Sequence, residues 1–118
     1  MREIKFKSKR LDNLEWVEGD LYHNVRGFEC CIGQQEKDGV YVYPVDPSTV
    51  CQFTGLKDKN GTPIYEGDIV IYKDDNAERR GEISWSNQIS SFSFGCGLLL
   101  YFPTNCMVVV GNKFDKEK

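Results

Sequence analysis

The sequence predicts an all-β protein of about nine short strands. Apolar and polar residues alternate with a period of two along most of the 118 residues, as they do in half-buried strands. Turn-forming residues separate these segments at the spacing typical of β-sandwiches and barrels. No run of about ten residues shows a helical pattern. We therefore expect a β-barrel or sandwich with at most one short helix or 3₁₀ turn.

The first half of the chain shows the alternation most clearly. In Glu3–Lys7, the apolar side chains fall on one face and the charged ones on the other. Further strands are predicted over Leu14–Tyr22, Phe28–Ile32 and Val40–Val45, with a turn over Gly33–Gly39. Leu14 and Trp16 are expected on one face of their strand and Val17 on the other. Asp46 and Pro47 have the pattern of an N-cap and a first helical residue, so a 3₁₀ turn is expected there.

The second half begins with a strong hairpin signal, Asn60-Gly61. Five strands are predicted after it: Ile69–Lys73, Arg80–Trp85, Ile89–Phe94, Leu98–Phe102 and Met107–Val110. Gly67–Val70, a turn, Gly81–Ile83 and the aromatic strands after them are typical of an SH3-like element, and an OB-like barrel is also compatible. The length predicts a single domain over residues 1–114, followed by a polar tail over residues 115–118.

Composition limits the classes of protein and partner. Fifteen Lys and Arg oppose 18 Asp and Glu, which gives a formal net charge of −3 and argues against a surface that attracts phosphate everywhere. No apolar run approaches the roughly 20 residues that cross a bilayer, and the first residues lack the apolar centre of a signal peptide. We therefore expect a cytoplasmic protein with no membrane partner.

Residues suited to catalysis or metal binding are few. His23 is the only histidine, none of the five cysteines forms a C-x-x-C pair, and no catalytic or phosphate-binding motif occurs. We predict no catalytic residue, no metal ligand and no cofactor. Cys30 and Cys31 should point to opposite faces of a strand, one buried and one more accessible. The cysteines are interpreted as small apolar filler, with a redox or metal role as the alternative. An enzyme would require Cys31, His23 and an acid such as Asp20 to converge.

The segment Val50–Val70 is the densest motif. Asn60-Gly61 closes a tight turn, and Glu66 and Asp68 flank Gly67 at the entrance of a strand. The two carboxylates either form a metal or acid–base pair, or have structural roles, with Asp68 bonded to backbone N–H groups and Glu66 solvated or paired with a lysine.

This segment strongly resembles the central signature of the YopX family of phage and prophage proteins. The motif residues are Gln52, Phe53, Thr54, Gly55, Leu56, Asp58, Asn60, Gly61, Ile64, Tyr65, Glu66, Gly67, Asp68 and Val70. Arg2–Phe6 resembles the opening strand of the family, and Val110–Asn112 resembles its closing element. The resemblance implies a β-rich fold, a phage or prophage origin inside a bacterial host and no established enzymatic activity.

A noncatalytic interaction or assembly protein is the function we favour from the sequence. Open strand edges and aromatic residues, among them Tyr41 and Tyr43, suit an interface with another protein or a second copy of the chain. In the apolar run Leu98–Phe102, alternate side chains point to opposite faces. Either both faces are covered within the fold, or one meets another chain in a homo-oligomer. The candidate interface residues are Leu98, Leu100 and Phe102.

A nucleic-acid-binding barrel is the alternative. Five basic residues could meet phosphates: Lys57, Lys59, Lys73, Arg79 and Arg80. Trp85, Phe92 and Phe94 could stack on bases, although strand alternation would place them in the core. Asp74, Asp75, Glu78 and Glu82 in the same region oppose this hypothesis.

Overall fold

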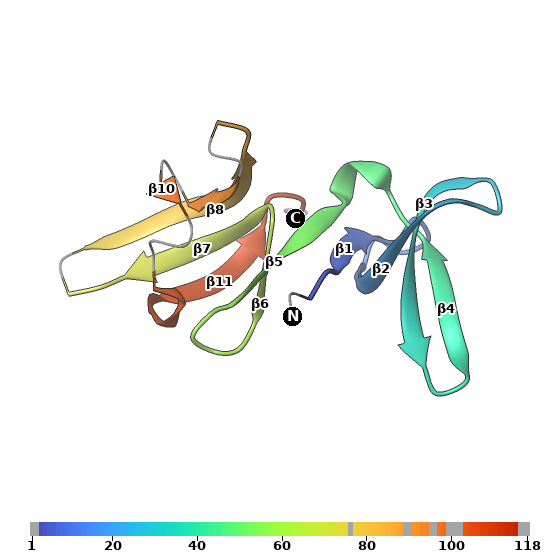
Figure 1. The fold of residues 1–118 in the computed structure, drawn as a ribbon, viewed down its shortest axis with the longest axis horizontal. Coiled ribbons are helices and arrows are strands. Elements are labelled where there is room, and N and C mark those ends of the chain that lie inside the picture. Colours follow the sequence, from blue (N-terminus) through green and yellow to red (C-terminus); the bar gives the residue numbers. More distant parts are fainter. Residues whose placement is uncertain (1–2, 76, 89–90, 95–96, 99–102, 116–118) are drawn as a thin grey trace. The chain divides into compact units, whose positions relative to one another are not determined.

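The computed structural model describes residues 3–75, 77–88, 91–94, 97–98 and 103–115 (Figure 1). These residues form antiparallel strands and two 3₁₀ turns, η1 (Pro47–Thr49) and η3 (Thr104–Cys106), so the predicted all-β class is confirmed. The strand order is β4-β3-β2-β1-β5-β6 in one sheet and β10-β9-β8-β7-β11 in the other. Both sheets are open in the described ranges, so of the two predicted forms, barrel or sandwich, the barrel is wrong.

The chain divides into two compact units, residues 1–53 and 54–118. The division falls within β5 (Cys51–Lys57), whose first residues pair with β1. Residues within each unit contact one another more than they contact the other unit. This does not establish whether the units fold separately, so a single domain over residues 1–114 stays a prediction.

Unit 1 is built from a meander of four strands: β1 (Phe6–Lys9), β2 (Trp16–Val25), β3 (Phe28–Glu36) and β4 (Gly39–Pro44). Its apolar core consists of Val17, Cys30, Ile32 and Val45. In Figure 1, the β3–β4 hairpin projects from the rest of the unit with β4 as its outer strand.

Two expectations for unit 1 are wrong. Leu14 has a positive φ of 63° and lies in the turn before β2, so the strand begins at Trp16. The predicted turn Gly33–Gly39 shrinks to the tip at Lys37 and Asp38, because β3 continues to Glu36. Gly33 serves close packing within the strand: a Cβ there would come 2.5 Å from Cε2 of Tyr22.

The link from β4 to β5 matches its prediction. Asp46 is the N-cap of η1, and its Oδ1 accepts a hydrogen bond from the Ser48 N–H at 3.0 Å. The buried Ser8 and Thr49 hydroxyls lie 2.7 Å apart, and Thr49 Oγ1 accepts the Lys9 N–H at 2.9 Å. Neutral hydroxyl groups therefore bond the buried backbone where η1 meets β1.

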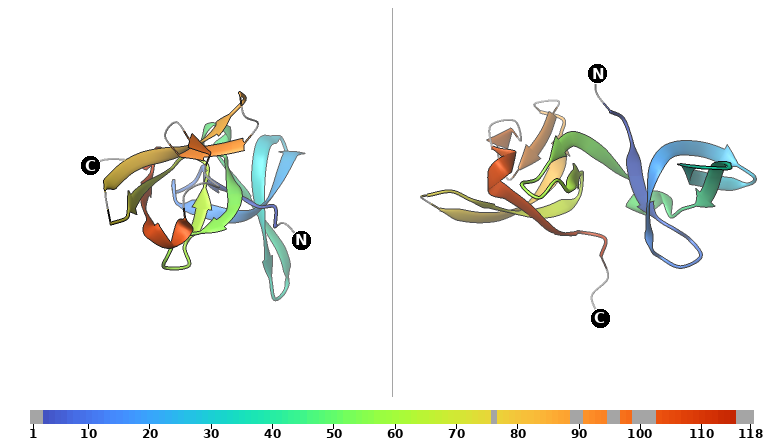
Figure 2. Two further views of the ribbon diagram at one scale, coloured as in Figure 1. Left: turned by 60° about the vertical axis from the view of Figure 1, so that its left-hand side comes forward. Right: turned by 90° about the horizontal axis from the view of Figure 1, so that it is seen from below.

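Unit 2 contains the rest of the strands: β6 (Pro63–Tyr65), β7 (Asp68–Lys73), β8 (Glu78–Ser86), β9 (Ser91–Phe94), β10 (Gly97–Leu98) and β11 (Met107–Asn112). Figure 2 shows β7, β8 and β11 from two further sides. The apolar core of unit 2 is larger than that of unit 1. It consists of Ile64, Val70, Tyr72, Ile83, Phe92, Phe94 and Met107.

Cys30 and Cys31 are both buried, with 6% and 1% of their surface exposed, so the expected difference in accessibility is wrong. Cys30 belongs to the apolar core of unit 1. Cys31 points to the other face of β3 and pairs across the sheet with Tyr22 on one side and Pro44 on the other. The two side chains alternate as predicted, but both faces of β3 are covered at this point.

Candidate interaction surface

The buried Asp58 carboxylate organises the turn between β5 and β6. Its Oδ1 accepts hydrogen bonds from the N–H groups of Asn60 and Thr62, each at 2.9 Å. Its Oδ2 accepts the N–H of Val109 in β11, also at 2.9 Å. Burial raises the pKa of Asp58, but the bonds from Val109, Thr62 and Asn60 outweigh it, so the pKa is lowered. Asp58 thus fastens the Asn60-Gly61 turn to β11 as an ionised carboxylate.

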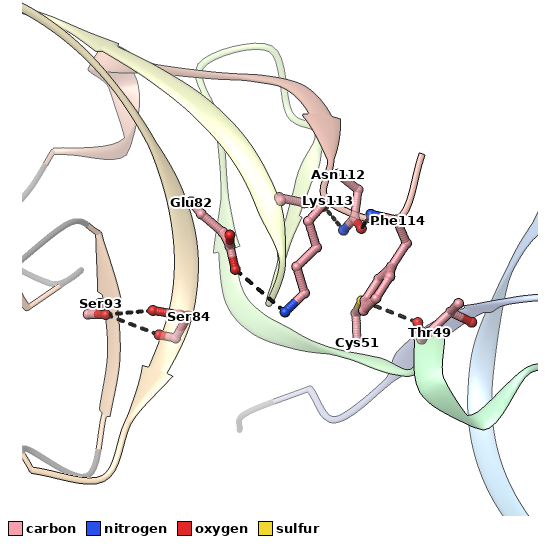
Figure 3. Close-up of polar contacts among 9 residues, drawn as sticks. Thr49, Cys51, Glu82, Ser84, Ser93, Asn112, Lys113 and Phe114 are labelled. Carbon is pink, nitrogen blue, oxygen red and sulfur yellow. Dashed lines mark hydrogen bonds and ion pairs between the residues drawn. The ribbon is translucent and has the colours of Figure 1, made fainter. Parts of the chain in front are cut away.

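A second buried carboxylate, Asp68, joins the start of β7 to the end of β11. Its Oδ2 accepts the Tyr65 N–H, and its Oδ1 accepts a hydrogen bond from Asn112 Nδ2, both at 2.8 Å. Asn112 Oδ1 in turn accepts the Phe114 N–H at 2.9 Å (Figure 3). Gly67 adopts a φ of 88°, which glycine permits without strain, and its carbonyl accepts the Lys113 N–H at 2.9 Å.

The Asp58 and Asp68 carboxylates therefore contact backbone and amide donors. Asp68 is fully buried, whereas Glu66 is half-buried. Within the described ranges, no group of three or more His, Cys, Asp or Glu side chains is placed to hold a metal ion. Other motif positions are core residues, such as Phe53 and Ile64, or turn residues, such as Gly61 with a φ of 82°.

The arrangement that an enzyme would need is not formed by His23, Cys31 and Asp20. His23 pairs with Cys30 across β2 and β3, so its side chain lies on the face opposite to that of Cys31. Burial raises the pKa of the Cys30 thiol, which disfavours the reactive thiolate. The hypothesis that Cys31, His23 and Asp20 converge is therefore wrong.

The candidate nucleic-acid contacts are exposed but do not gather into one basic strip. Lys73 and Arg80 share a face of the β7–β8 pair with Glu78 and Glu82, and Arg79 points to the other face. Lys57 and Lys59 lie at the end of β5 and in the following turn. Among the candidate stacking residues, Phe92 and Phe94 are buried, as alternation predicted, and Trp85 is exposed.

The apolar run Leu98–Phe102 can be followed only in part. Leu98 pairs with Ser93 as the last residue of β10. Leu100 and Phe102 lie outside the described residues, so the predicted interface there stays a prediction.

The outer strand β4 presents an apolar surface to solvent. The exposed fractions of Val40, Tyr41 and Val42 are 47%, 48% and 40%. Val40 and Val42 share a face with Tyr22, which is also exposed and lies over Gly33. Tyr41 and Tyr43 point to the other face. A groove of about 440 Å³ runs along this strand and is lined by Val25, Arg26 and Val40–Tyr43. We call these residues (Tyr22, Val25, Arg26 and Val40–Tyr43) the β4 surface.

The backbone of β4 also has hydrogen-bonding groups that point away from its sheet. The Val45 N–H donates to the Cys30 carbonyl at 3.1 Å. Val45 and Cys30 are therefore a hydrogen-bonded pair of the antiparallel ladder, in which two opposite residues exchange backbone bonds. Such pairs alternate along an antiparallel ladder, so Tyr43, Tyr41 and Gly39 bond to β3. Val40 and Val42 must then direct their N–H and C=O groups outward. The same parity points the Pro44 carbonyl outward, and this carbonyl accepts the Leu11 N–H at 3.0 Å.

The sequence indicates Tyr41 and Tyr43 as interface residues but does not single out their strand. The available signal was an uncharged segment, Gly39–Val45, next to a charged tip at Lys37 and Asp38. What the sequence could not show is that β4 ends its sheet, because strand order depends on pairing between distant segments.

The chain is a small all-β protein with two open antiparallel sheets in its described residues and hydrogen-bonded carboxylates in its interior. The model of the YopX protein family matches residues 5–116, so the chain belongs to the YopX family. The resemblance predicted from Val50–Val70 is confirmed.

A solved structure, that of protein EF1440 from Enterococcus faecalis, is similar in fold. Its TM-score is 0.55 at 22% sequence identity, and the match covers 95% of this chain and 94% of that one. Among curated proteins, no significant match was found. In the described part of the chain, no helix has the length and apolar character that crossing a membrane requires.

Proposed function

We propose that the protein is a noncatalytic accessory protein of a phage or prophage and acts in the cytoplasm of the bacterial host by binding protein. The observation that carries this proposal is the β4 surface, where exposed apolar side chains accompany outward backbone groups. An extended strand of another protein can add to such an edge through main-chain hydrogen bonds, with side-chain pockets providing specificity.

The rest of the described chain supports binding over catalysis. The motif carboxylates Asp58 and Asp68 are engaged by donors of the fold, and His23 and Cys31 lie on opposite faces. Strand β4 itself has no charged residue and no proline before its last position, Pro44, although such residues usually protect a sheet edge from other strands.

Site-specific photo-cross-linking in the host cell tests this function. A photoreactive residue at position 42 should yield adducts with protein, whereas the same residue at position 110 should not. Val110 is a matched control because its exposed fraction, 46%, is close to that of Val42. Equal adducts from both positions, or none from position 42, would contradict the proposal.

A nucleic-acid-binding module remains the alternative function. The exposed Trp85 and the basic residues of β7 and β8 favour it, and the interleaved Glu78 and Glu82 oppose it. Gel-shift titrations at low salt distinguish the two functions, because phosphate contacts are strongest there. We expect no shift with single- or double-stranded DNA or RNA.

A further inference from the structure

We infer that the β4 edge pairs with β4 of a second copy of this chain, antiparallel and about a two-fold axis at Tyr41. This inference rests on the proposed function and names its partner. The outward groups of Val40 and Val42, the apolar side chains around them and the charges at the two ends of the strand carry it.

The outward backbone groups fit a two-fold partner. In antiparallel self-pairing centred on Tyr41, Val40 of one copy stands opposite Val42 of the other. Each of these two pairs exchanges two N–H···O=C bonds, so all four outward groups of both residues in each copy are used. Gly39 then faces Tyr43. Pairing ends there because Leu11 already bonds to the Pro44 carbonyl.

The side chains fit the same register. Tyr41 meets its own copy in a pair without mutual hydrogen bonds, in which Cα atoms approach to about 4.5 Å and side chains are closest. Cross-strand pairs of aromatic and β-branched residues are favourable, and each Val40–Val42 pair is of the β-branched kind. Tyr22 extends the apolar area on that face in both copies.

The charges at the ends of β4 favour the antiparallel arrangement. The hairpin tip carries Glu36 and Asp38 on either side of Lys37. The other end carries Arg26, which lines the same groove as Tyr43. Arg10 also lies at this end, 4.4 Å from the centre of the Tyr43 ring, but its guanidinium is already paired with Asp12. Antiparallel pairing brings the tip of each copy towards Arg26 of the other, whereas parallel pairing would place like ends together.

The size of the contact sets its strength. A single pair of short strands belongs with interfaces below about 1,200 Å² of buried surface, which are mostly transient. The fraction of dimer should therefore rise with protein concentration, and the dimer should dissociate again on dilution. A two-fold axis uses the same surface on both copies, so association stops at two chains and does not extend into a fibre.

Analytical ultracentrifugation of the full chain over a range of concentrations tests the pairing. The wild-type chain should shift from monomer to dimer. Val42→Lys should raise the dissociation constant at least about tenfold, since it places a charge in the apolar centre of the contact. Val110→Lys, the same change at a similarly exposed valine of unit 2, should leave the constant unchanged.

Val42→Pro tests the role of the backbone separately. It removes an outward N–H while leaving the bonds between β4 and β3 in place, as proline does on edge strands. It should abolish the dimer and preserve the far-ultraviolet circular dichroism of the wild type. If Val42→Pro fails to fold, the Val42→Lys and Val110→Lys comparison decides.

Cysteine cross-linking tests the register. Under oxidation, Tyr41→Cys should form a covalent dimer, because the two-fold axis brings residue 41 of both copies together at a Cα separation that a disulfide can span. Val40→Cys should not, because it faces Val42 of the other copy. Equal cross-linking of both variants beyond the wild type would overturn the register.

The outcomes separate this inference from the proposed function. A monomer at every concentration, or a dimer that survives Val42→Lys, overturns the self-pairing. If position 42 then still cross-links to a different protein in the host, the proposed function stands with another partner. If position 42 yields no adducts, both fail.

Discussion

The two units of the chain handle their buried polar groups differently. Unit 2 buries the carboxylates Asp58 and Asp68, each bonded to backbone N–H or amide donors. In unit 1, the buried bonds around η1 are made by the hydroxyls of Ser8 and Thr49. Charge-assisted bonds are stronger than neutral ones but depend on pH. The family signature from Thr54 onward thus builds the interior of unit 2, whereas the candidate interaction surface lies in unit 1.

The largest loss of stability is expected from a change of charge beside the buried Asp68 of unit 2. Asn112→Asp places a second carboxylate against the buried Asp68 and should lower the free energy of unfolding by about 3–5 kcal/mol at pH 7. Urea denaturation followed by circular dichroism measures this loss.

A swapped pair provides the control for Asn112→Asp. In the double variant Asp68→Asn/Asn112→Asp, the amide donates from position 68, and the carboxylate at 112 still accepts the Phe114 N–H. Much of the stability should return. A double variant no more stable than Asn112→Asp would show that charge pairing is not the cause.

A steric change should have the next largest effect, and it falls in unit 1. In Gly19→Ala, the new Cβ would lie 2.1 Å from the Gly33 carbonyl oxygen, so β2 and β3 must separate locally. Overpacking of this kind should lower the free energy of unfolding by about 3 kcal/mol in the same urea assay. In Gly39→Ala, the matched control, the positive φ remains but no atom lies within 4 Å, so the loss should be about 1 kcal/mol. Equal losses of unfolding free energy in the two variants would show that the close approach of Gly19 and Gly33 does not matter for stability.

A smaller effect is expected from Asp58, and it should depend on pH. Asp58→Asn replaces one acceptor oxygen with a donor that faces a backbone N–H, at a cost of about 2 kcal/mol near pH 7. Because the folded-state pKa of Asp58 is lowered, its ionised form stabilises the fold above the unfolded pKa of about 3.9. This contribution is lost as the pH falls through the folded pKa. The stability difference between wild type and Asp58→Asn should therefore shrink in acid. A difference that stays constant from pH 7 to pH 3 would contradict this role.

The smallest effect is expected at the N-cap of η1. Asp46→Ala removes the acceptor of the Ser48 N–H and should cost about 1 kcal/mol, whereas Asp46→Asn keeps an acceptor and should cost less. Thermal unfolding of the two variants measures the difference, and equal losses would show that the cap bond contributes little.

The sequence predicted the elements better than their connections. Alternation located most strands, and Asp46-Pro47 located η1, because both signals are local. The extension of β3 through Gly33 differs from the prediction because this glycine makes room for the Tyr22 ring and does not form a turn. The open sheets, the burial of both Cys30 and Cys31, and the position of β4 at an edge depend on pairing between distant segments, which local patterns do not encode.

The candidate site followed the same rule. The pattern of Val50–Val70 indicates a unit, but Val109 lies 51 residues beyond its partner Asp58, and Asn112 lies 44 residues beyond its partner Asp68. Tyr41 and Tyr43 were recognised as interface material, whereas the outward direction of Val40 and Val42 required the register with β3.

Amide hydrogen exchange along β4, followed residue by residue at two protein concentrations, tests the central claim most directly. In dilute solution, the amides of Val40 and Val42 should exchange fast, and those of Tyr41 and Tyr43, bonded to β3, should exchange slowly. At high concentration, Val40 and Val42 should become protected while the others change little. If Val40 and Val42 exchange equally fast at both concentrations, the claim that this edge pairs with a second copy is contradicted.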